Sequence, residues 1–446
     1  MAETNKAIRG TNDILPDESH KWQYVESKMI ETAGLFGFKE TRVPVFEATE
    51  VFVRSVGDTT DVVQKEMYTF DDKGGRSITL RPEFTAGTVR SVIEHSLVNG
   101  ALPVKVCYCG TCYRYEKPQA GRLREFHQFG VECFGAQQPS ADAEIILLAN
   151  AILLSLGIKN ISLEINSIGC PDCRKRYQEA LKQYFKSKKD ELCATCNERL
   201  NKNAMRILDC KSPVCSKIAE AAPIMLDYLC DDCKNHFDAV KEHLRSAKVN
   251  FTVNPRIVRG LDYYTKTVFE FVSGDIGAQS TVCGGGRYDG LVAQMGGPQL
   301  PSLGFAMGIE RLLMVMEKQG CEFPAAKHID VYVAAIGDSA KYEATGICMA
   351  LRNKGFSAAT DLSGRGLKAQ MKYADKIGAN YCIVLGDDEL EAGRCSFRDM
   401  KTGEQQDVAL GDEILATIYD KRIKAAMTEL SDSLGDESDL LIKNNG

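Results

Sequence analysis

Apolar side chains recur at helical spacing near the start of the chain. Every third or fourth residue is apolar over residues 19–36, which predicts a helix there. Runs of β-branched and aromatic residues then predict short strands over residues 39–45, 67–70 and 77–80. A second helical pattern covers residues 84–97.

Two longer strands are predicted over residues 104–116 and 126–134, with a turn-rich stretch between them. In the second strand Gln128, Gly130 and Glu132 share one face, because successive side chains point to opposite sides of a strand. A glycine between two polar residues clears space above the sheet. We therefore expect a ligand to lie over this face.

This hairpin also carries cations. Arg114 and Glu116 share a face of the first strand, and the connecting turn adds Arg122 and Arg124. An arginine side chain offers a planar fork of donors that suits phosphate oxygens. The hairpin is therefore expected to reach phosphate groups.

The middle of the chain changes character. Residues 170–245 are charge-rich and mostly helical, and strand patterns return over residues 250–273 and 302–307 before a helix that begins at residue 309. A run of strands with a separate group of helices is typical of an α+β fold.

Beyond a break near residues 323–326, strands and helices alternate. Strands are expected over residues 329–335, 356–360, 381–385 and 396–400, with a helix over residues 367–377. This alternation predicts a small α/β domain over residues 326–425. Residues 426–446 are rich in Asp, Ser, Lys and Asn and predict a flexible tail.

Composition narrows the class of protein. The chain has 446 residues, 44% of them hydrophobic, which is enough for two or three globular domains. It has no apolar run of membrane-spanning length and no apolar signal core at the N-terminus, so a cytoplasmic protein without a membrane partner is expected. The net charge of −6 argues against a DNA-coating protein, but local basic patches can still bind RNA.

Cysteine is concentrated in the helical stretch. Of the 17 cysteines, eight lie there: Cys170, Cys173, Cys193, Cys196, Cys210, Cys215, Cys230 and Cys233. Three pairs have the two-residue spacing that lets both sulfurs face one metal, and disulfides are not expected in this compartment. The pattern favours tetrahedral zinc, although reduced thiols on a helical insertion would also fit, and the pairing of the cysteines stays open.

A short string near residue 260 fits no ordinary structural need. Arg256, Arg259 and Asp262 stand beside Tyr263 and Tyr264. Aromatic walls with a fixed cation suit a pocket for a small charged ring that is bound beside a phosphate. We expect this string to line a binding site.

Three further motifs surround it. They are Leu80-Arg-Pro-Glu-Phe-Thr-Ala86, Cys283-Gly-Gly-Gly-Arg-Tyr-Asp289, and a strand ending in Gly308 that opens a helix with Arg311 off its apolar stripe. In this order, together with the hairpin, the motifs resemble those of the class II aminoacyl-tRNA synthetases, and specifically the histidyl-tRNA synthetases. One departure is Phe84, which stands where many members carry glycine.

The resemblance implies an α+β fold with a class II catalytic domain on an antiparallel sheet. That domain would span residues 1–325, interrupted by a cysteine-rich helical insertion over residues 170–245, and an α/β anticodon-binding domain would follow over residues 326–425. The implied reaction uses ATP and Mg²⁺ to convert histidine to histidyl-adenylate. The histidyl group then passes to the 3′-terminal ribose of tRNA(His), and the implied assembly is a homodimer.

The resemblance also assigns the histidine-binding residues. Glu83, Thr85 and Gln128 would hold the α-ammonium group of histidine. Glu132 and Tyr264, with Tyr263 nearby, would read the imidazole. A carboxylate and a hydroxyl can together satisfy the donor and the acceptor of that ring.

The remaining roles concern ATP and tRNA. Arg114 would bind the histidine carboxylate and the ATP α-phosphate, and Arg259 would stabilise charge on that phosphate. Glu116 would bind the adenine end, Arg122 the ATP, and Arg311 the γ-phosphate. The candidates for contacts with the tRNA acceptor end are Gln119 and Arg124.

Two other functions are compatible with parts of the sequence. The regulatory subunit of the histidine-biosynthetic ATP phosphoribosyltransferase resembles the catalytic core, but it lacks the anticodon domain and much of the signature that carries Arg259. A zinc-dependent RNA-binding protein without enzyme activity would leave Arg114 and Arg311 unexplained. The sequence therefore favours the enzyme.

Overall fold

The computed structural model divides the chain into two compact units, Met1–Pro324 and Ala325–Gly446, and each is described by itself. No helix of the described residues is long and apolar enough to cross a membrane. The structure describes residues 5–56, 60, 62–202, 204–208, 210, 212–257, 263–277, 280–326, 328–424 and 427. Apart from Met427, the predicted tail over residues 426–446 lies outside them.

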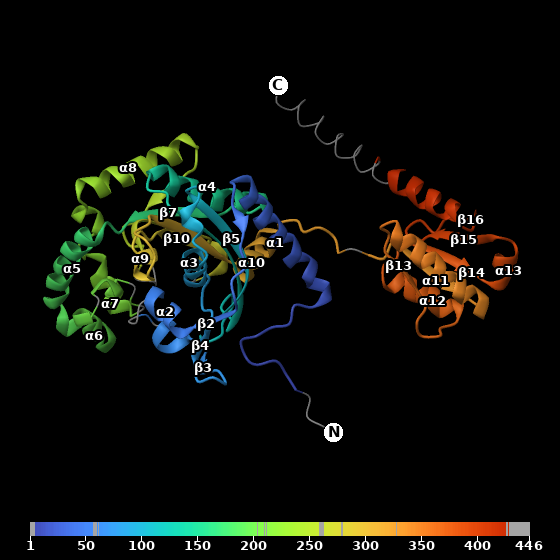
Figure 1. Cartoon of the computed structure of the whole chain (residues 1–446), viewed down its shortest axis with the longest axis horizontal. Coiled ribbons are helices and arrows are strands. Elements are labelled where there is room, and N and C mark those ends of the chain that lie inside the picture. The colour runs from blue at the N-terminus through green and yellow to red at the C-terminus, as the bar shows by residue number, and fades with distance from the viewer. Residues whose placement is uncertain are drawn as a thin grey trace. The chain divides into compact units, whose positions relative to one another are not determined.

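An eight-stranded sheet forms the centre of the first unit (Figure 1). Its strands, in spatial order, are β1 (Lys39–Glu40), β5 (Val104–Tyr113), β6 (Glu125–Phe134), β11 (Ser302–Gly308), β10 (Thr281–Arg287), β9 (Thr265–Val272), β7 (Ser162–Ser167) and β8 (Thr252–Val253). The six central strands pair antiparallel, and the two short edge strands pair parallel to their neighbours.

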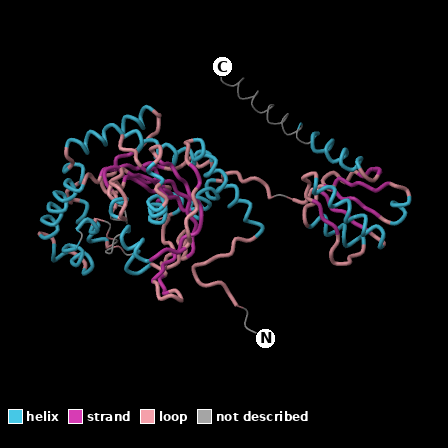
Figure 2. The backbone as a smooth tube through the Cα atoms, viewed as in Figure 1, coloured by secondary structure: helices cyan, strands magenta, loops and turns pink. Residues whose placement is uncertain are grey.

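Helices cover one face of this sheet and supply its hydrophobic core (Figure 2). They are α1 (Pro16–Leu35), α4 (Pro139–Ser155), α8 (Asp231–Ser246) and α10 (Ile309–Gln319). Phe129 and Val131 of β6 are fully buried on this side. Because strand side chains alternate, their neighbours Gln128 and Glu132 point to the opposite face.

The opposite face is bordered by smaller elements. They are a three-stranded sheet of β2 (Phe46–Ala48), β4 (Ser77–Leu80) and β3 (Thr69–Asp71), together with α2 (Thr49–Val56), a π-helix over Val62–Glu66, α3 (Thr85–Glu94), a 3-10 turn over Leu97–Asn99 and α9 (Leu291–Gln294). Another 3-10 turn, Gly274–Ile276, follows β9.

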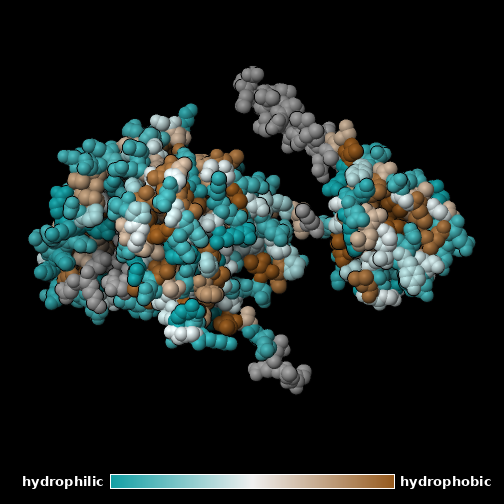
Figure 3. Space-filling model, viewed as in Figure 1, coloured by the Kyte–Doolittle hydropathy of each residue, from teal (hydrophilic) through white to brown (hydrophobic). Residues whose placement is uncertain are grey.

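The cysteine-rich insertion is a small helical body with a core of its own. Its helices are α5 (Pro171–Lys186), α6 (Ala194–Lys202) and α7 (Pro213–Glu220), with 3-10 turns at Lys189–Glu191, Ala204–Ile207 and Met225–Tyr228. The side of the first unit that carries α5 and α8 is mostly hydrophilic (Figure 3). Helix α8 does not pack within the insertion along its whole length. Its Phe237, Val240 and Leu244 are buried in the core of the large sheet.

The second unit has a five-stranded sheet with the order β13 (Ala358–Thr360), β12 (Val331–Ala335), β14 (Tyr381–Leu385), β15 (Arg394–Asp399) and β16 (Gln405–Ala409). The first three strands are parallel and the last two add antiparallel. Its helices are α11 (Asp338–Asn353), α12 (Leu367–Lys376) and α13 (Asp387–Glu391). The predicted fold class, an α+β unit on an antiparallel sheet followed by a small α/β domain, is confirmed.

Two predicted strands are too long. The strand expected over residues 39–45 ends at Glu40, and the strand expected over residues 104–116 ends at Tyr113. The Tyr113 N–H donates to the carbonyl of Arg81 at 2.9 Å, and the Arg114 N–H makes a last hydrogen bond across the hairpin, to the carbonyl of Arg124 at 2.8 Å. Arg114 and Glu116 therefore lie just beyond the strand.

The sequence patterns missed several elements, among them α4 and β10. Helix α4 is apolar around most of its circumference, so it shows no helical stripe, as expected for a buried helix. Strand β10 contains three consecutive glycines, which usually indicate a turn. Glycine is required there by close packing, since a Cβ on Gly285 would lie 2.3 Å from the carbonyl oxygen of Gly304.

Candidate active site

A cavity of about 1240 Å³ opens on the face of the large sheet opposite α4. It extends from the strands to the start of α3, the start of α10 and the insertion. The predicted site residues that line it are Glu83, Thr85, Arg114, Glu116, Arg122, Gln128, Glu132, Tyr263, Tyr264 and Arg311. Segments far apart in the sequence thus bring these side chains together.

Three predicted site residues stand apart from this set. Arg259 lies outside the described residues. Gln119 forms a backbone bridge with Arg122 in the hairpin turn, and the Arg124 guanidinium lies 3.9 Å from the centroid of the Tyr115 ring. Gln119 and Arg124 therefore do not line the cavity, although the turn residues between them, Gly121, Arg122 and Leu123, do.

Glu132 is the most enclosed acid of the cavity. Its carboxylate accepts hydrogen bonds from Thr85 Oγ1 at 2.7 Å, from the Tyr108 hydroxyl at 2.9 Å and from the Tyr288 hydroxyl. Gly304 makes room for it, since a Cβ there would lie 2.0 Å from Glu132 Oε2. Three donors and one glycine hold this carboxylate in a fixed position.

Burial raises the pKa of the Glu132 carboxyl to about 8. The three hydroxyl donors favour the carboxylate and act against this shift, while the negative charge of Glu83 adds to it. A carboxyl group with a strongly shifted pKa in a cavity is typical of a functional site.

The space directly above Gly130 is filled by the Tyr108 ring, so it is not the gap for a ligand that the alternating pattern predicted. Tyr108 lies opposite Gly130 on β5, and a Cβ on Gly130 would lie 2.5 Å from the Tyr108 ring. Phe84 stacks on that ring at a centroid distance of 4.4 Å. The glycine and Phe84 therefore position Tyr108, which donates to Glu132.

Glu83 joins the cavity to the start of α3. Its two carboxylate oxygens accept the backbone N–H groups of Thr85 at 2.6 Å and Ala86 at 2.9 Å. Burial nevertheless raises the pKa of Glu83. The carboxylate caps the helix and retains lone pairs for a further donor.

Gln128 lies across the same face. Its side-chain oxygen accepts a hydrogen bond from the Cys112 thiol at 3.4 Å, and an amide oxygen has a second lone pair for another donor.

A chain of charges lines the hairpin side of the cavity. Arg114 Nε donates to the carbonyl of Pro82 at 2.8 Å, and its terminal nitrogen lies 3.9 Å from Glu116. The other oxygen of Glu116 lies 2.8 Å from the Arg122 guanidinium. These contacts fix two arginines and one carboxylate at the point where β5 ends.

Arg311 projects from the start of α10 into the same region. Its guanidinium donates to the carbonyl oxygens of Gly121 at 3.2 Å and Thr281 at 2.6 Å. Burial lowers the pKa of Arg311, and the positive charge of Arg122 acts in the same direction. The cavity end formed by these arginines suits a polyanion.

Tyr263 and Tyr264 form an aromatic wall beside Glu132. Their ring centroids are 4.7 Å apart, and the Tyr263 ring meets the Tyr288 ring edge to face at 5.5 Å. Sequence reasoning left Tyr108 and Tyr288 without a role, although both donate to Glu132. The motif around Tyr288 was noticed, but the sequence could not show which side chain its hydroxyl would meet.

The eight cysteines of the insertion form two quartets. We call Cys170, Cys173, Cys230 and Cys233 the base quartet, and Cys193, Cys196, Cys210 and Cys215 the distal quartet. Within each quartet the four sulfurs lie within 4.8 Å of one another. This arrangement shows which pairs of cysteines combine, a question that their spacing in the sequence left open. Two members of the distal quartet, Cys193 and Cys210, also line the cavity.

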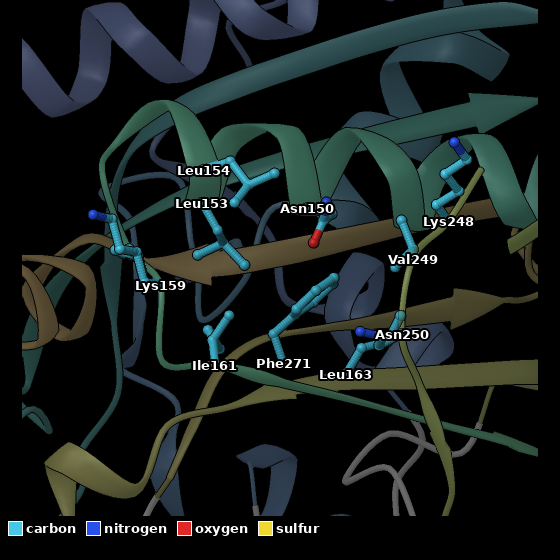
Figure 4. A pocket seen from close by; sticks show the side chains of 11 residues that line it. Asn150, Leu153, Leu154, Lys159, Ile161, Leu163, Lys248, Val249, Asn250 and Phe271 are labelled. Carbon is cyan, nitrogen blue, oxygen red and sulfur yellow. The ribbon is translucent and has the colours of Figure 1, made fainter. Parts of the chain in front are cut away.

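A second pocket of about 200 Å³ lies at the end of α4, on the helix-covered face of the sheet (Figure 4). Its walls include Leu153, Leu163 and Phe271, and Lys159 and Lys248 lie at its two ends. The residues that line it include no carboxylate, histidine or cysteine.

Comparison with known proteins gives a consistent result. A family model described as histidyl-tRNA synthetase matches residues 10–312, and one described as anticodon binding domain matches residues 330–418. A histidine–tRNA ligase from Acetivibrio thermocellus is 58% identical over 405 residues, which cover 91% of this chain and 97% of the relative. One from Caldanaerobacter subterraneus subsp. tengcongensis is 53% identical over 409 residues, covering 92% and 98%.

Solved structures agree. The apo histidyl-tRNA synthetase of S. aureus is 40% identical with a TM-score of 0.80, covering 93% of this chain and all of that one. A Bacillus halodurans structure named as an ATP phosphoribosyltransferase regulatory subunit/histidyl-tRNA synthetase shares the fold, with a TM-score of 0.63 and 22% identity over 86% of this chain and all of that one. The resemblance inferred from the motifs is confirmed, and the chain belongs to the histidyl-tRNA synthetase family.

Proposed function

We propose that the cavity on the large sheet carries out both steps of histidine–tRNA ligation, with its acids binding histidine and its arginines binding ATP. The chain activates histidine to histidyl-adenylate and transfers the histidyl group to tRNA(His). The observation that supports this location is the hydrogen-bonded Glu132, which shares one cavity with Arg114 and Arg311.

Histidine would bind at the acidic end. Glu83, Thr85 and Gln128 would hold the α-ammonium group, because carboxylate, hydroxyl and amide oxygens all accept hydrogen bonds. Glu132 would meet one ring nitrogen of the imidazole and Tyr264 the other, with Tyr263 closing the wall. An amino acid without these two ring nitrogens would leave buried polar groups unpaired and would be rejected.

ATP would bind at the basic end. Arg114 would bridge the histidine carboxylate and the α-phosphate, Arg311 would hold the γ-phosphate, and Glu116 and Arg122 would contact the remaining parts of the nucleotide. One carboxylate oxygen of histidine attacks the α-phosphorus, the bond from that phosphorus to the bridging oxygen breaks, and pyrophosphate leaves. The protein contributes positioning and charge neutralisation.

Magnesium fits the same end of the cavity. Glu116 and Glu270 line it and lie close enough for their charges to act on Arg311, and carboxylate oxygens are ligands that Mg²⁺ prefers. When bound, Mg²⁺ would neutralise charge on the phosphates. Glu270 is the residue that we propose to hold the ion or its water shell, because Glu116 is paired with Arg122 and is assigned to the nucleotide.

Arg259→Ala tests the residue that sequence alone assigns to the α-phosphate. We expect adenylate formation to slow by about 100- to 1000-fold, because a donor aimed at charge that develops during attack is lost. The melting temperature should change little. Rapid-quench measurement of adenylate provides the test, and a near-normal rate would exclude this role.

Aminoacylation of a tRNA(His) transcript with labelled histidine tests the overall function. The proposed enzyme should charge this transcript and leave a tRNA(Phe) transcript uncharged. A folded sample that charges neither, but binds the histidine-biosynthetic phosphoribosyltransferase, would favour the regulatory-subunit alternative. The anticodon-binding model that matches residues 330–418 favours the enzyme.

The remaining assignments are proposals of the same kind. Residues 1–325 would carry catalysis, with residues 170–245 as the insertion, and residues 326–425 would bind the anticodon. Gln119 and Arg124, at the cavity edge, would contact the acceptor end of the tRNA. A cytoplasmic homodimer is the proposed working state, and a monomer in sedimentation at micromolar concentration would contradict it.

We also propose that the insertion binds zinc. Four thiolates in one cluster are a common structural zinc site, and all 17 cysteines of the chain are free of disulfides. The two quartets offer one such cluster each.

A further inference from the structure

The two cysteine quartets are built alike. In the base quartet, Cys170 and Cys230 are the N-caps of α5 and α8, and their partners lie in the first turn of the same helices. In the distal quartet, Cys193 and Cys196 lie at the start of α6 and Cys215 lies in the first turn of α7, whereas Cys210 precedes α7 and its N-cap. Helix starts present unpaired N–H groups and a positive dipole end, and both favour thiolates.

Backbone donors already point at the sulfurs. The Cys230 N–H donates to Cys173 Sγ at 3.0 Å, and the Cys193 N–H donates to Cys215 Sγ at 3.3 Å. The sulfur–sulfur distances of 3.5 Å between Cys170 and Cys173 and 3.9 Å between Cys193 and Cys210 are close to the value of about 3.8 Å that follows from four Zn–S bonds of about 2.3 Å in a tetrahedron. Both clusters are therefore shaped for one ion each.

Each quartet is also linked to the string that precedes β9. Residues 258–262 lie outside the described part of the chain, but both of their flanks are described. Tyr263 and Tyr264 form the following flank, and Arg256 and Ile257 form the preceding one. Helices of the insertion hold both flanks.

The base quartet holds the following flank. Arg174, the residue after Cys173, donates to the carbonyl oxygen of Tyr264. Gly169, the residue before Cys170, accepts the Lys266 N–H at 2.9 Å. The sulfur cluster therefore lies one residue away from two contacts with the chain around the aromatic wall.

The distal quartet holds the preceding flank. Arg256 donates to the carbonyl oxygen of Glu220 at 2.9 Å, and Glu220 is the last residue of α7, the helix that contains Cys215. A second contact steadies this flank from the sheet, since Asn166 donates to the carbonyl of Ile257 at 3.3 Å. The position of α7 thus decides where Arg256 can bind.

We propose that each quartet binds one zinc ion, and that the two ions position the two flanks of residues 258–262, so that zinc occupancy sets the affinity for histidine. This inference rests on the proposed histidine site at Glu132 and Tyr264. The insertion has a small core and a mostly hydrophilic surface, so metal binding would supply much of the order of its helices (Figure 3). Loss of an ion would loosen one flank while the large sheet and the arginines at the ATP end stay in place.

The experiment compares zinc content with kinetics in full-length variants. Wild-type protein purified without chelator should hold two zinc ions per chain by elemental mass spectrometry. Cys233→Ser and Cys196→Ser should each hold one. In histidine-dependent pyrophosphate exchange, the KM for histidine should rise by about 3- to 30-fold in each variant, as expected for coupling between neighbouring sites, while the KM for ATP stays within about twofold.

Two further variants keep the result interpretable. Cys321→Ser removes a cysteine outside both quartets and should change neither zinc content nor kinetics. Arg174→Met should keep both zinc ions and still raise the KM for histidine, so the coupling remains testable where a cysteine variant does not fold.

Each contrary result has a distinct meaning. Wild-type protein that exchanges pyrophosphate but contains no zinc would overturn the inference and leave the proposed function standing. Zinc loss with an unchanged KM for histidine, or an equal rise in the KM for histidine and ATP, would overturn the positioning role. Wild-type protein that holds two zinc ions but shows no histidine-dependent exchange would overturn the proposed function, and with it the inference.

Discussion

Glu132→Gln should lower kcat/KM for histidine in pyrophosphate exchange by about 1000-fold or more, with little change in the KM for ATP. An imidazole bound in this cavity would lose the carboxyl group that pairs with its ring nitrogen, and sites built to hydrogen-bond a substrate group lose about 10⁴-fold or more when one partner is missing. The side chain is fixed by Thr85, Tyr108 and Tyr288, so a neighbouring group cannot simply move into its place.

The same variant should show a pH-dependent change in stability. The pKa of the Glu132 carboxyl is raised from an ordinary value of 4.5 to about 8, so the folded chain binds more protons than the unfolded chain between these values. Wild-type stability therefore falls as pH rises from about 4.5 to about 8. Glutamine removes this dependence, and the melting temperature of the variant relative to wild type should increase from pH 5 to pH 8.5.

A matched control lies on the same strand. Glu125→Gln replaces an acid at the start of β6, outside the cavity lining, and should leave both measurements near wild type. Equal losses for histidine and ATP in Glu132→Gln would indicate general damage to the sheet, and would contradict a specific role in reading the imidazole.

Arg114→Lys should slow adenylate formation by about 1000-fold, although the charge is retained. Arg114 uses Nε to hold the Pro82 carbonyl at 2.8 Å and so presents its terminal nitrogens toward the cavity. Lysine has a single point charge and cannot keep this anchor while it bridges a carboxylate and a phosphate. Removal of one donor of this kind costs about 100- to 1000-fold, and Arg114 would serve two groups.

Single-turnover measurement of histidyl-adenylate provides the test for Arg114→Lys. Arg76→Lys is the control, because Arg76 is exposed in the turn between β3 and β4 and pairs with Asp72. A loss of less than tenfold in Arg114→Lys would mean that charge alone suffices at this position.

Much of the site could be predicted from the sequence, because its residues lie in motifs with a recognisable order. The alternating pattern of the hairpin predicted that Gln128 and Glu132 share one face. The structure places both side chains in the cavity with Arg114 and Arg311. The cysteine spacing indicated metal ligands, but only the three-dimensional structure groups them into two quartets. The spacing of the cysteines shows which of them are close in sequence, whereas their grouping into quartets depends on how helices α5, α6, α7 and α8 pack together.

Other features could not be predicted, because they depend on contacts between distant segments. The alternating pattern placed a ligand above Gly130, but the Tyr108 ring occupies that space from the neighbouring strand. Helix α4 and strand β10 were missed because burial on all sides removes the periodicity of a helix, and close packing selects glycine in a strand. Tyr288 was part of a recognised motif, but its hydrogen bond to Glu132 spans 156 residues of sequence.

ATP–pyrophosphate exchange with each of the twenty amino acids, in the absence of tRNA, tests the central claim most directly. The arrangement of Glu132, Tyr264 and the arginines predicts exchange with histidine and only background with the other nineteen. Exchange with several amino acids would contradict a cavity that reads the imidazole. A folded sample that exchanges with none would contradict the proposal that this cavity forms an adenylate.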